Sequence, residues 1–100
     1  MRSFEHIATI IKEKRVGHSK GYSQTELSHL LGYKNGQFIS NVERGLCSIP
    51  LKMLSKVCHI LHINREELKI AIMKDYDRTI ELHLNLPPDQ VVRGDEKEED

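Results

Sequence analysis

The sequence predicts an all-α fold, a bundle of five helices followed by one short strand. Apolar residues recur every three or four positions through most of residues 3–76, which predicts amphipathic helices. Cap residues and glycines stand between these runs, where helices begin and end. Over residues 79–86 polar and apolar residues alternate instead, a pattern typical of a strand. At 100 residues the chain is expected to form one domain with a short appendage.

The first two helices are separated by a polar connector that glycines bracket. The first is expected over residues 3–15, because its apolar side chains fall at helical spacing. The second begins at a capping box, in which the Ser23 hydroxyl and the Glu26 carboxylate each accept from the other residue's backbone N–H. A leucine stripe and then Gly32 follow, so this helix is short and ends in a glycine turn.

The third helix is expected from Gly36 to Arg44 and is ended by Gly45. Phe38 and Val42 stand four residues apart, so they lie on one apolar face. The other face of this helix is polar and carries Gln37, Ser40, Asn41 and Arg44.

The last two helices also have recognisable starts. The fourth is expected to begin near Pro50, whose fixed φ suits the first helical position, and to run to Leu61. Asn64 and Glu67 form a second capping box, which opens a fifth helix that reaches Tyr76.

The alternating segment of residues 79–86 predicts a strand with one apolar face, stopped by Pro87. No other segment offers a strand to pair with it, and a lone strand leaves its backbone groups unmatched. The simplest partner is the same strand of a second copy, across a two-fold axis. The alternative is that the fifth helix continues through this segment. The predicted dimer contacts are Ile80, Leu82, Leu84 and Leu86.

Basic and acidic residues are unevenly distributed along the chain, although its net charge is zero. Residues 1–74 contain twelve Lys/Arg and six Asp/Glu, whereas residues 75–100 contain three Lys/Arg and nine Asp/Glu. A basic body suits a polyanionic partner, and an acidic end repels itself. We therefore expect a basic helical domain over residues 1–75, a dimerisation segment over residues 76–88, and a disordered acidic tail over residues 89–100.

Several classes of protein are not indicated. No apolar run approaches the roughly 18 residues that span a bilayer, and residues 1–9 lack the apolar core of a signal peptide, so a cytoplasmic protein without a membrane partner is expected. Cys47 and Cys58 form no CxxC pair and are expected to be reduced thiols without a metal. The chain carries no phosphate loop, HExxH or nucleophile elbow, so neither an enzyme nor a cofactor is expected.

Two short helices joined by a glycine turn, with a polar face on the second, form a helix-turn-helix. In this arrangement the first helix crosses the phosphate backbone, where Gln24 would supply a donor beside the free N–H groups of the helix end. The second helix lies in the major groove and needs side chains that match base edges. Gln37 or Asn41 could pair bidentately with adenine, and each good pair discriminates by roughly 1–3 kcal/mol.

These residues resemble the Cro/C1-type helix-turn-helix family, the XRE family of repressors, over about residues 5–70. The resemblance lies in Ser23-Gln24-Thr25-Glu26-Leu27 through Gly32, in Ile39-Ser40-Asn41-Val42-Glu43-Arg44-Gly45, and in Pro50 and Leu54. It implies a lambda-repressor-like bundle of four or five helices and a dimeric regulator of transcription bound to double-stranded DNA.

The resemblance also implies roles for single residues. Gln24 would anchor the DNA backbone, and Gln37 and Asn41 would read bases. The segment from Gly32 to Ile39 is one residue longer than in the shortest phage repressors, and Gly36 stands where many relatives carry a side chain. The predicted DNA-contacting residues are Gln24, Lys34, Asn35, Gly36, Gln37, Ser40, Asn41 and Arg44.

Two functions from different classes are open at this point. The first is a sequence-specific regulator, a repressor, that places two recognition helices in successive major grooves about 34 Å apart on a palindromic operator. The second is an antitoxin or another interaction module, whose residues 78–100 bind a partner protein while the basic part binds DNA.

Overall fold

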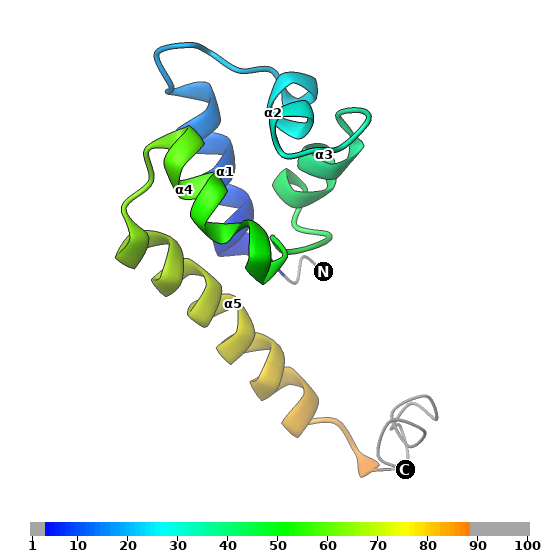
Figure 1. The fold of residues 1–100 in the computed structure, drawn as a ribbon. Helices are drawn as coiled ribbons and strands as arrows, with labels where there is room; N and C mark the ends of the chain where they lie inside the picture. The colour runs from blue at the N-terminus through cyan, green and yellow to red at the C-terminus, as the bar shows by residue number, and fades with distance from the viewer. Residues whose placement is uncertain (1–3, 89–100) are drawn as a thin grey trace.

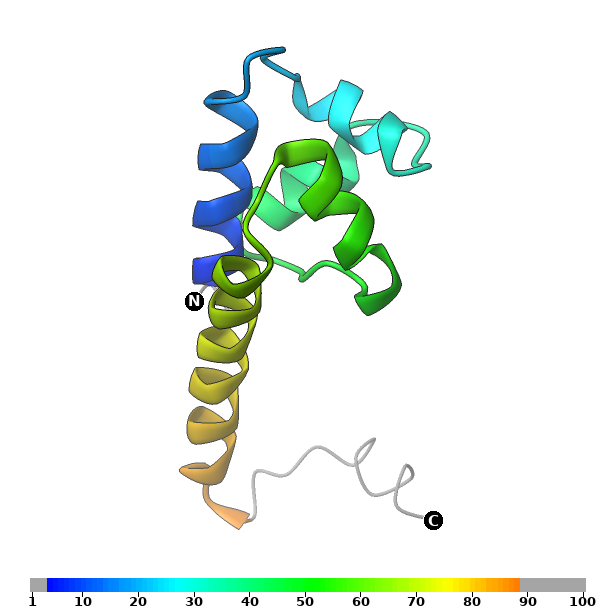
Figure 2. The same cartoon turned by 60° about the vertical axis from the view of Figure 1, so that its left-hand side comes forward.

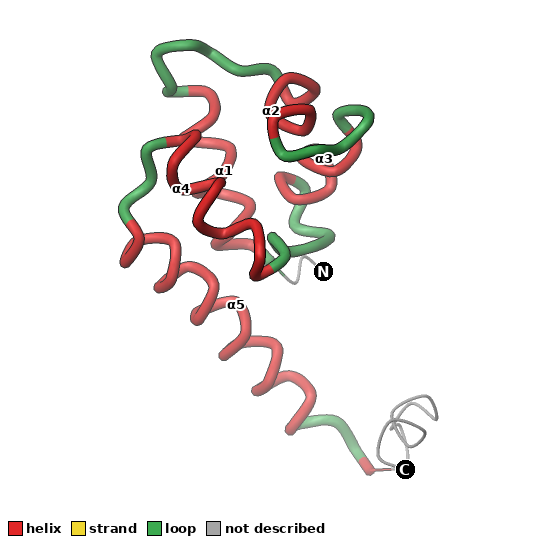
Figure 3. The backbone as a smooth tube through the Cα atoms, viewed as in Figure 1, coloured by secondary structure: helices red, strands yellow, loops and turns green. Residues whose placement is uncertain are grey.

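The computed structural model describes residues 4–88, and every regular element in that range is a helix (Figures 1 and 3). The all-α prediction is confirmed. None of the helices within the described range is long and apolar enough to span a membrane. The elements are α1 (Glu5–Val16), α2 (Gln24–Leu30), α3 (Gln37–Glu43), the 3-10 turn η1 (Leu51–Met53), α4 (Leu54–Leu61) and α5 (Arg65–Leu84).

Helix α1 packs against both α3 and α5, and α2 packs against α3. The apolar stripes predicted for these helices meet in one core. Full burial of a large aliphatic side chain contributes about 1.5–3 kcal/mol, so a handful of such residues accounts for the cohesion of a small bundle. The most deeply buried aliphatic residues are Ile7, Ile11, Leu27, Ile39, Val42 and Val57.

The predicted helix starts are confirmed at two positions. Glu26 N–H donates to Ser23 Oγ at 3.0 Å, and Ser23 N–H donates to Glu26 Oε1 at 2.8 Å, so the capping box of α2 is complete. Asn64 Oδ1 accepts from the backbone N–H groups of Glu66 and Glu67 at 2.8 and 3.4 Å. The carboxylate of Glu67 does not complete this second box as predicted, since it lies 3.5 Å from Lys14 Nζ on α1.

The start of α1 is capped by a residue from the far end of the domain. Its own N-cap residue, Phe4, supplies no side-chain cap. Asp75 on α5 takes this role: its Oδ2 accepts from Ile7 N–H, and its Oδ1 accepts from both His6 N–H and His6 Nδ1, each at 2.9 Å. A carboxylate only accepts, so Nδ1 carries the proton of the His6 ring. Asp75 is 1% exposed, and these bonds join α5 to α1 across the sequence.

The predicted strand over residues 79–86 is wrong, because α5 continues as a helix to Leu84 (Figure 3). Extending an existing helix adds one hydrogen bond per residue without a new nucleation step, whereas a strand here would need a partner. The helix ends just before Pro87, where a proline disfavours the helical conformation of the residue before it. In Figures 1 and 2 the last part of α5 projects beyond the other helices.

Because this segment is helical, the four predicted dimer residues do not lie on one common side. Ile80 and Leu84 lie four positions apart and share one side of α5, whereas Leu82 lies on the opposite side and Leu86 follows the helix. All four side chains are exposed, from 42% for Leu82 to 74% for Leu84. The predicted acidic tail of residues 89–100 lies outside the described residues.

Candidate nucleic-acid interface

Helix α3 lies beside α2 at the edge of the molecule and turns one side toward the core (Figure 1). On that side Ile39 and Val42 have no exposed surface. The helix is therefore held by its apolar side and presents the other side to solvent. The residues of this outer side are Gln37 and Arg44, which are exposed, and Ser40 and Asn41, which are half-buried.

Gly36 is the N-cap of α3, and it marks the closest approach of α3 to α2. A Cβ atom placed on Gly36 would lie 2.7 Å from Thr25 Oγ1 and 3.2 Å from Thr25 Cα and N. Its φ of −76° is accessible to any residue, so steric space and not backbone conformation explains the glycine. The family resemblance puts Gly36 where many relatives carry a side chain, and the contact with Thr25 gives a packing reason for its absence here.

Two side chains satisfy the backbone at the start of α3. Asn35 Oδ1 accepts from Gln37 N–H at 2.9 Å, and Ser28 Oγ accepts from Ile39 N–H at 3.2 Å. Ser28 is fully buried in α2 and was not among the predicted site residues. Its position three residues before Leu31, on the apolar stripe, was the signal that could have identified it. The spacing of α2 and α3 is thus fixed by a hydrogen bond as well as by apolar contacts.

The end of α3 is tied to both preceding helices through Glu43. Arg15 Nε and Nη2 donate to the two Glu43 carboxylate oxygens at 2.6 and 2.9 Å, and Arg15 Nη1 donates to Tyr22 O at 3.0 Å. Gln24 Nε2 donates to Glu43 Oε1 at 2.9 Å. The hydrogen bond to Glu43 raises the pKa of Arg15, so the guanidinium stays charged. This network connects α1, α2 and α3 and fixes the amide of Gln24 at the first turn of α2.

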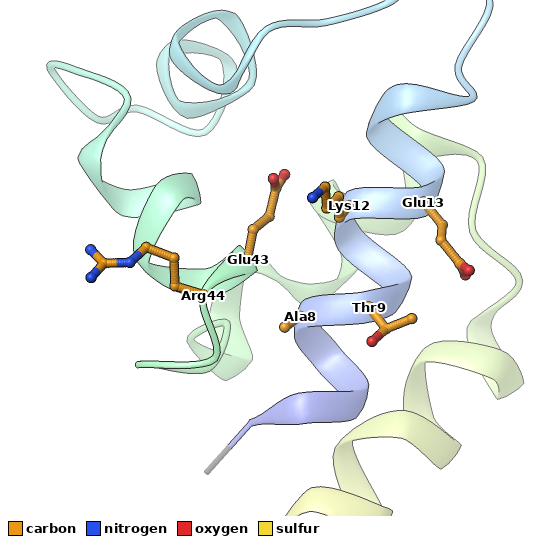
Figure 4. A pocket seen from close by; sticks show the side chains of 6 residues that line it. All are labelled: Ala8, Thr9, Lys12, Glu13, Glu43 and Arg44. Carbon is orange, nitrogen blue, oxygen red and sulfur yellow. The ribbon is translucent and has the colours of Figure 1, made fainter. Parts of the chain in front are cut away.

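A shallow groove separates α1 from the end of α3 (Figure 4). In this view Lys12 and Glu43 point toward each other across the groove, and Arg44 points away from α1. The lining mixes acidic and basic side chains. The residues around it are Ala8, Thr9, Lys12, Glu13, Glu43 and Arg44.

The two predicted base readers contact each other. Gln37 Nε2 donates to Asn41 Oδ1 at 2.8 Å across one turn of α3. Residues four apart on a helix are neighbours on its surface, so this pairing follows from the sequence spacing. It leaves part of the hydrogen-bonding capacity of each amide directed at solvent.

The turn between α2 and α3 is held by two further contacts. His29 Nε2 lies 2.8 Å from Lys34 O, so this nitrogen carries the ring proton. The rings of Tyr33 and Phe38 stack with centroids 4.0 Å apart and planes 12° apart. The exposed Lys34 therefore extends from a turn whose backbone is fixed.

The structure brings most of the predicted DNA-contacting residues together. Gln24 lies at the start of α2 and is joined to α3 through Glu43. The predicted dimer residues lie apart from this surface, on the projecting end of α5. The residues that lie on α3 or in the turn before it are Lys34, Asn35, Gly36, Gln37, Ser40, Asn41 and Arg44.

Neither cysteine of the described range is in a disulfide. Burial raises the pKa of both Cys47 and Cys58, and Arg65 partly offsets this effect at Cys58. Between residues 4 and 88, no three His, Cys, Asp or Glu side chains are grouped so that they could hold a metal ion.

A comparison with protein families matches residues 11–68 to a family described as helix-turn-helix. None of the curated proteins and none of the solved structures matches the chain. The matched range contains the whole α2–turn–α3 unit, the Arg15–Glu43 pair that anchors it, and α4. The family and its fold therefore agree with the geometry, and the chain belongs to the Cro/C1-type (XRE) helix-turn-helix family of DNA-binding regulators of transcription.

Proposed function

We propose that the protein is a sequence-specific repressor that binds a palindromic operator as a homodimer, with the outer side of α3 in the major groove. The observation that carries this proposal is the outer side of α3 itself. It presents polar side chains that match base edges, on a helix fixed to α1 and α2 by hydrogen bonds. Such pre-organisation lowers the entropy cost of forming base contacts. Repression requires only that the bound protein occupy promoter DNA.

Phosphate contacts would come from the residues around α3. Gln24 uses one amide hydrogen on Glu43 and retains the other for a phosphate beside the first turn of α2. Lys34 and Arg44 lie at opposite ends of α3 and would neutralise phosphates on either side of the groove. Each phosphate neutralised steepens the dependence of affinity on salt by about 0.9 in the log–log slope.

The second part of the proposal, self-association, rests on the outer side of α5. Five large apolar side chains there are 47–74% exposed and repeat at intervals of three or four residues. This side lies opposite Leu68, Ala71 and Asp75, which face the core. Single exposed apolar residues are ordinary, but a contiguous set marks an interaction surface. The members of this apolar stripe are Ile70, Met73, Tyr76, Ile80 and Leu84.

We propose that a second copy of the chain covers the apolar stripe, with the two α5 helices antiparallel. An antiparallel pair has a two-fold axis, which is the symmetry of a palindromic operator.

The mass of the protein in solution, measured by light scattering, tests self-association. The full chain is expected to be a dimer, and Ile80→Glu together with Leu84→Glu should give a monomer. Leu82→Glu is the matched control, because it places the same charge on the opposite side of the same helix, and it should leave the dimer intact. A monomeric wild-type chain would contradict self-association and favour a partner protein on the stripe.

DNA binding is tested separately, by fluorescence anisotropy on duplexes selected from a random-sequence pool. Gln37→Ala is expected to weaken binding to the selected duplex by about tenfold or more. The control His59→Ala changes an exposed residue of α4 and should bind as the wild type does. Equal binding of the wild type to selected and unselected duplexes would refute sequence-specific recognition.

A further inference from the structure

The hydrogen bond between Gln37 and Asn41 restricts what each amide can offer to DNA. A primary amide carries two N–H donors and one oxygen with two lone pairs. Gln37 uses one N–H on Asn41 Oδ1, at 2.8 Å, and keeps its oxygen and its other N–H. Asn41 receives this bond on its oxygen and keeps both of its N–H donors. The two residues therefore present different patterns, although either amide alone could pair with adenine.

These patterns match different bases in the major groove. Adenine presents the N7 acceptor and the N6 amino donor, which one N–H and one oxygen satisfy together. Guanine O6 and thymine O4 are acceptors, which a donor side chain satisfies. Four residues of helix advance about 6 Å along the axis, and base pairs are about 3.4 Å apart. The two amides thus face base pairs one or two steps apart.

We propose that Gln37 reads an adenine, and that Asn41 both orients Gln37 and reads a keto base, guanine or thymine, one or two steps away in the same half-site. This inference rests on the proposed function and assigns the bases that α3 selects. Without Asn41 the amide of Gln37 can rotate and present its two N–H groups, which suit guanine. Asn41 is thus a positioning residue for the adenine contact and a direct reader of its own base.

Selection from a random duplex pool, followed by sequencing, tests this assignment with the full chain and variants at position 41. Asn41→Asp keeps an oxygen for the Gln37 N–H but loses both donors. This variant should still select adenine at the position that Gln37 reads. At the position that residue 41 reads, it should select cytosine in place of guanine or thymine, because the N4 amino group of cytosine donates to a carboxylate. Asn41→Ala should weaken both preferences, each by about tenfold or less. His59→Ala, away from α3, should select the wild-type sequence.

The outcomes separate this inference from the function on which it rests. The assignment is overturned if Asn41→Asp still selects guanine or thymine at the position that residue 41 reads. It is also overturned if Asn41→Ala weakens the base preference at only one of the two positions. The same holds if wild-type sites lack an adenine with a keto base one or two steps away. If the wild type enriches no sequence at all, the proposed function itself fails.

Discussion

Replacing Asp75 with alanine should destabilise the domain more than any other single change of an acidic residue on α5. Asp75 accepts three hydrogen bonds at 2.9 Å and is 1% exposed. Its removal leaves the N–H groups of His6 and Ile7 without their acceptor, and the N–H of Ile7 is buried. Loss of a helix cap costs about 1 kcal/mol, and a buried donor left unsatisfied costs about 1–3 kcal/mol. We therefore expect a loss of about 3 kcal/mol from the free energy of unfolding.

Urea unfolding followed by circular dichroism measures this loss. With an m-value of about 1.5 kcal/mol/M for a chain of this size, the midpoint should fall by about 2 M. A small domain has only about 5–15 kcal/mol of stability, so the effect is large. Each variant is measured at two protein concentrations, because self-association stabilises the folded state by mass action.

Glu81→Ala is the matched control for Asp75→Ala. It removes one carboxylate from the same helix at an exposed position, and it should change the free energy of unfolding by less than about 0.5 kcal/mol. A midpoint for Asp75→Ala that matches the Glu81→Ala midpoint would refute the cross-chain cap. It would show that the start of α1 is satisfied by water or by its own backbone.

Three further changes probe the site. Glu43→Ala leaves the partly buried guanidinium of Arg15 without its carboxylate, so thermal unfolding should show a loss of about 2–4 kcal/mol, somewhat less than for a fully buried pair, and a loss below about 1 kcal/mol would contradict this. Gly36→Ala should cost about 1–3 kcal/mol through its contact with Thr25, and Thr25→Ala in the same chain should restore part of that; additive effects would exclude the contact. Hydrogen bonds from the backbone N–H and hydroxyl of Ser23 lower the pKa of Glu26 below 4.5. Its stabilisation relative to Glu26→Gln is therefore present at pH 7 and disappears as pH falls through the lowered pKa, and a pH-independent difference in Tm would contradict this.

The parts of the fold that could be predicted are those that depend on neighbouring residues. The capping box at Ser23 and the turns at Gly32 and Gly45 involve residues within a few positions of one another, and the two glycines do adopt positive φ values of 93° and 77°. The apolar periodicity of α1, α2 and α3 identified the core for the same reason. Local chemistry also identified the helix-turn-helix itself.

The contacts that position the site could not be predicted in this way. The cap from Asp75 spans 69 residues, and the Arg15–Glu43 pair spans 28. Neither pair has a sequence separation that would identify one partner from the other. Gln24, which the family resemblance implied as a backbone anchor, proved also to bind Glu43, and this bond depends on how α2 and α3 pack.

The incorrect strand has a different cause. Periodicity reports which side of an element is buried, and the end of α5 beyond Arg78 lies outside the core, so burial does not set its pattern. Two apolar sides of a projecting helix, one with Ile80 and Leu84 and one with Leu82, give the same alternation as a strand. The sequence offers no strand to pair with this segment because the segment is helical, and strand pairing with a second copy was the wrong inference from that absence.

The cap on α1 also bears on how the protein is made. The acceptor for the first N–H groups of α1 is encoded 69 residues after them, near the end of the described chain. At about 5–20 residues per second, a ribosome needs roughly 3–14 seconds to reach Asp75 after it has made His6. Throughout that interval α1 lacks its cap and the surface of α5 on which it packs. The contact between α5 and α1 therefore forms only after Asp75 has been made, and a chain that ends before Asp75 would lack both the cap and this packing surface.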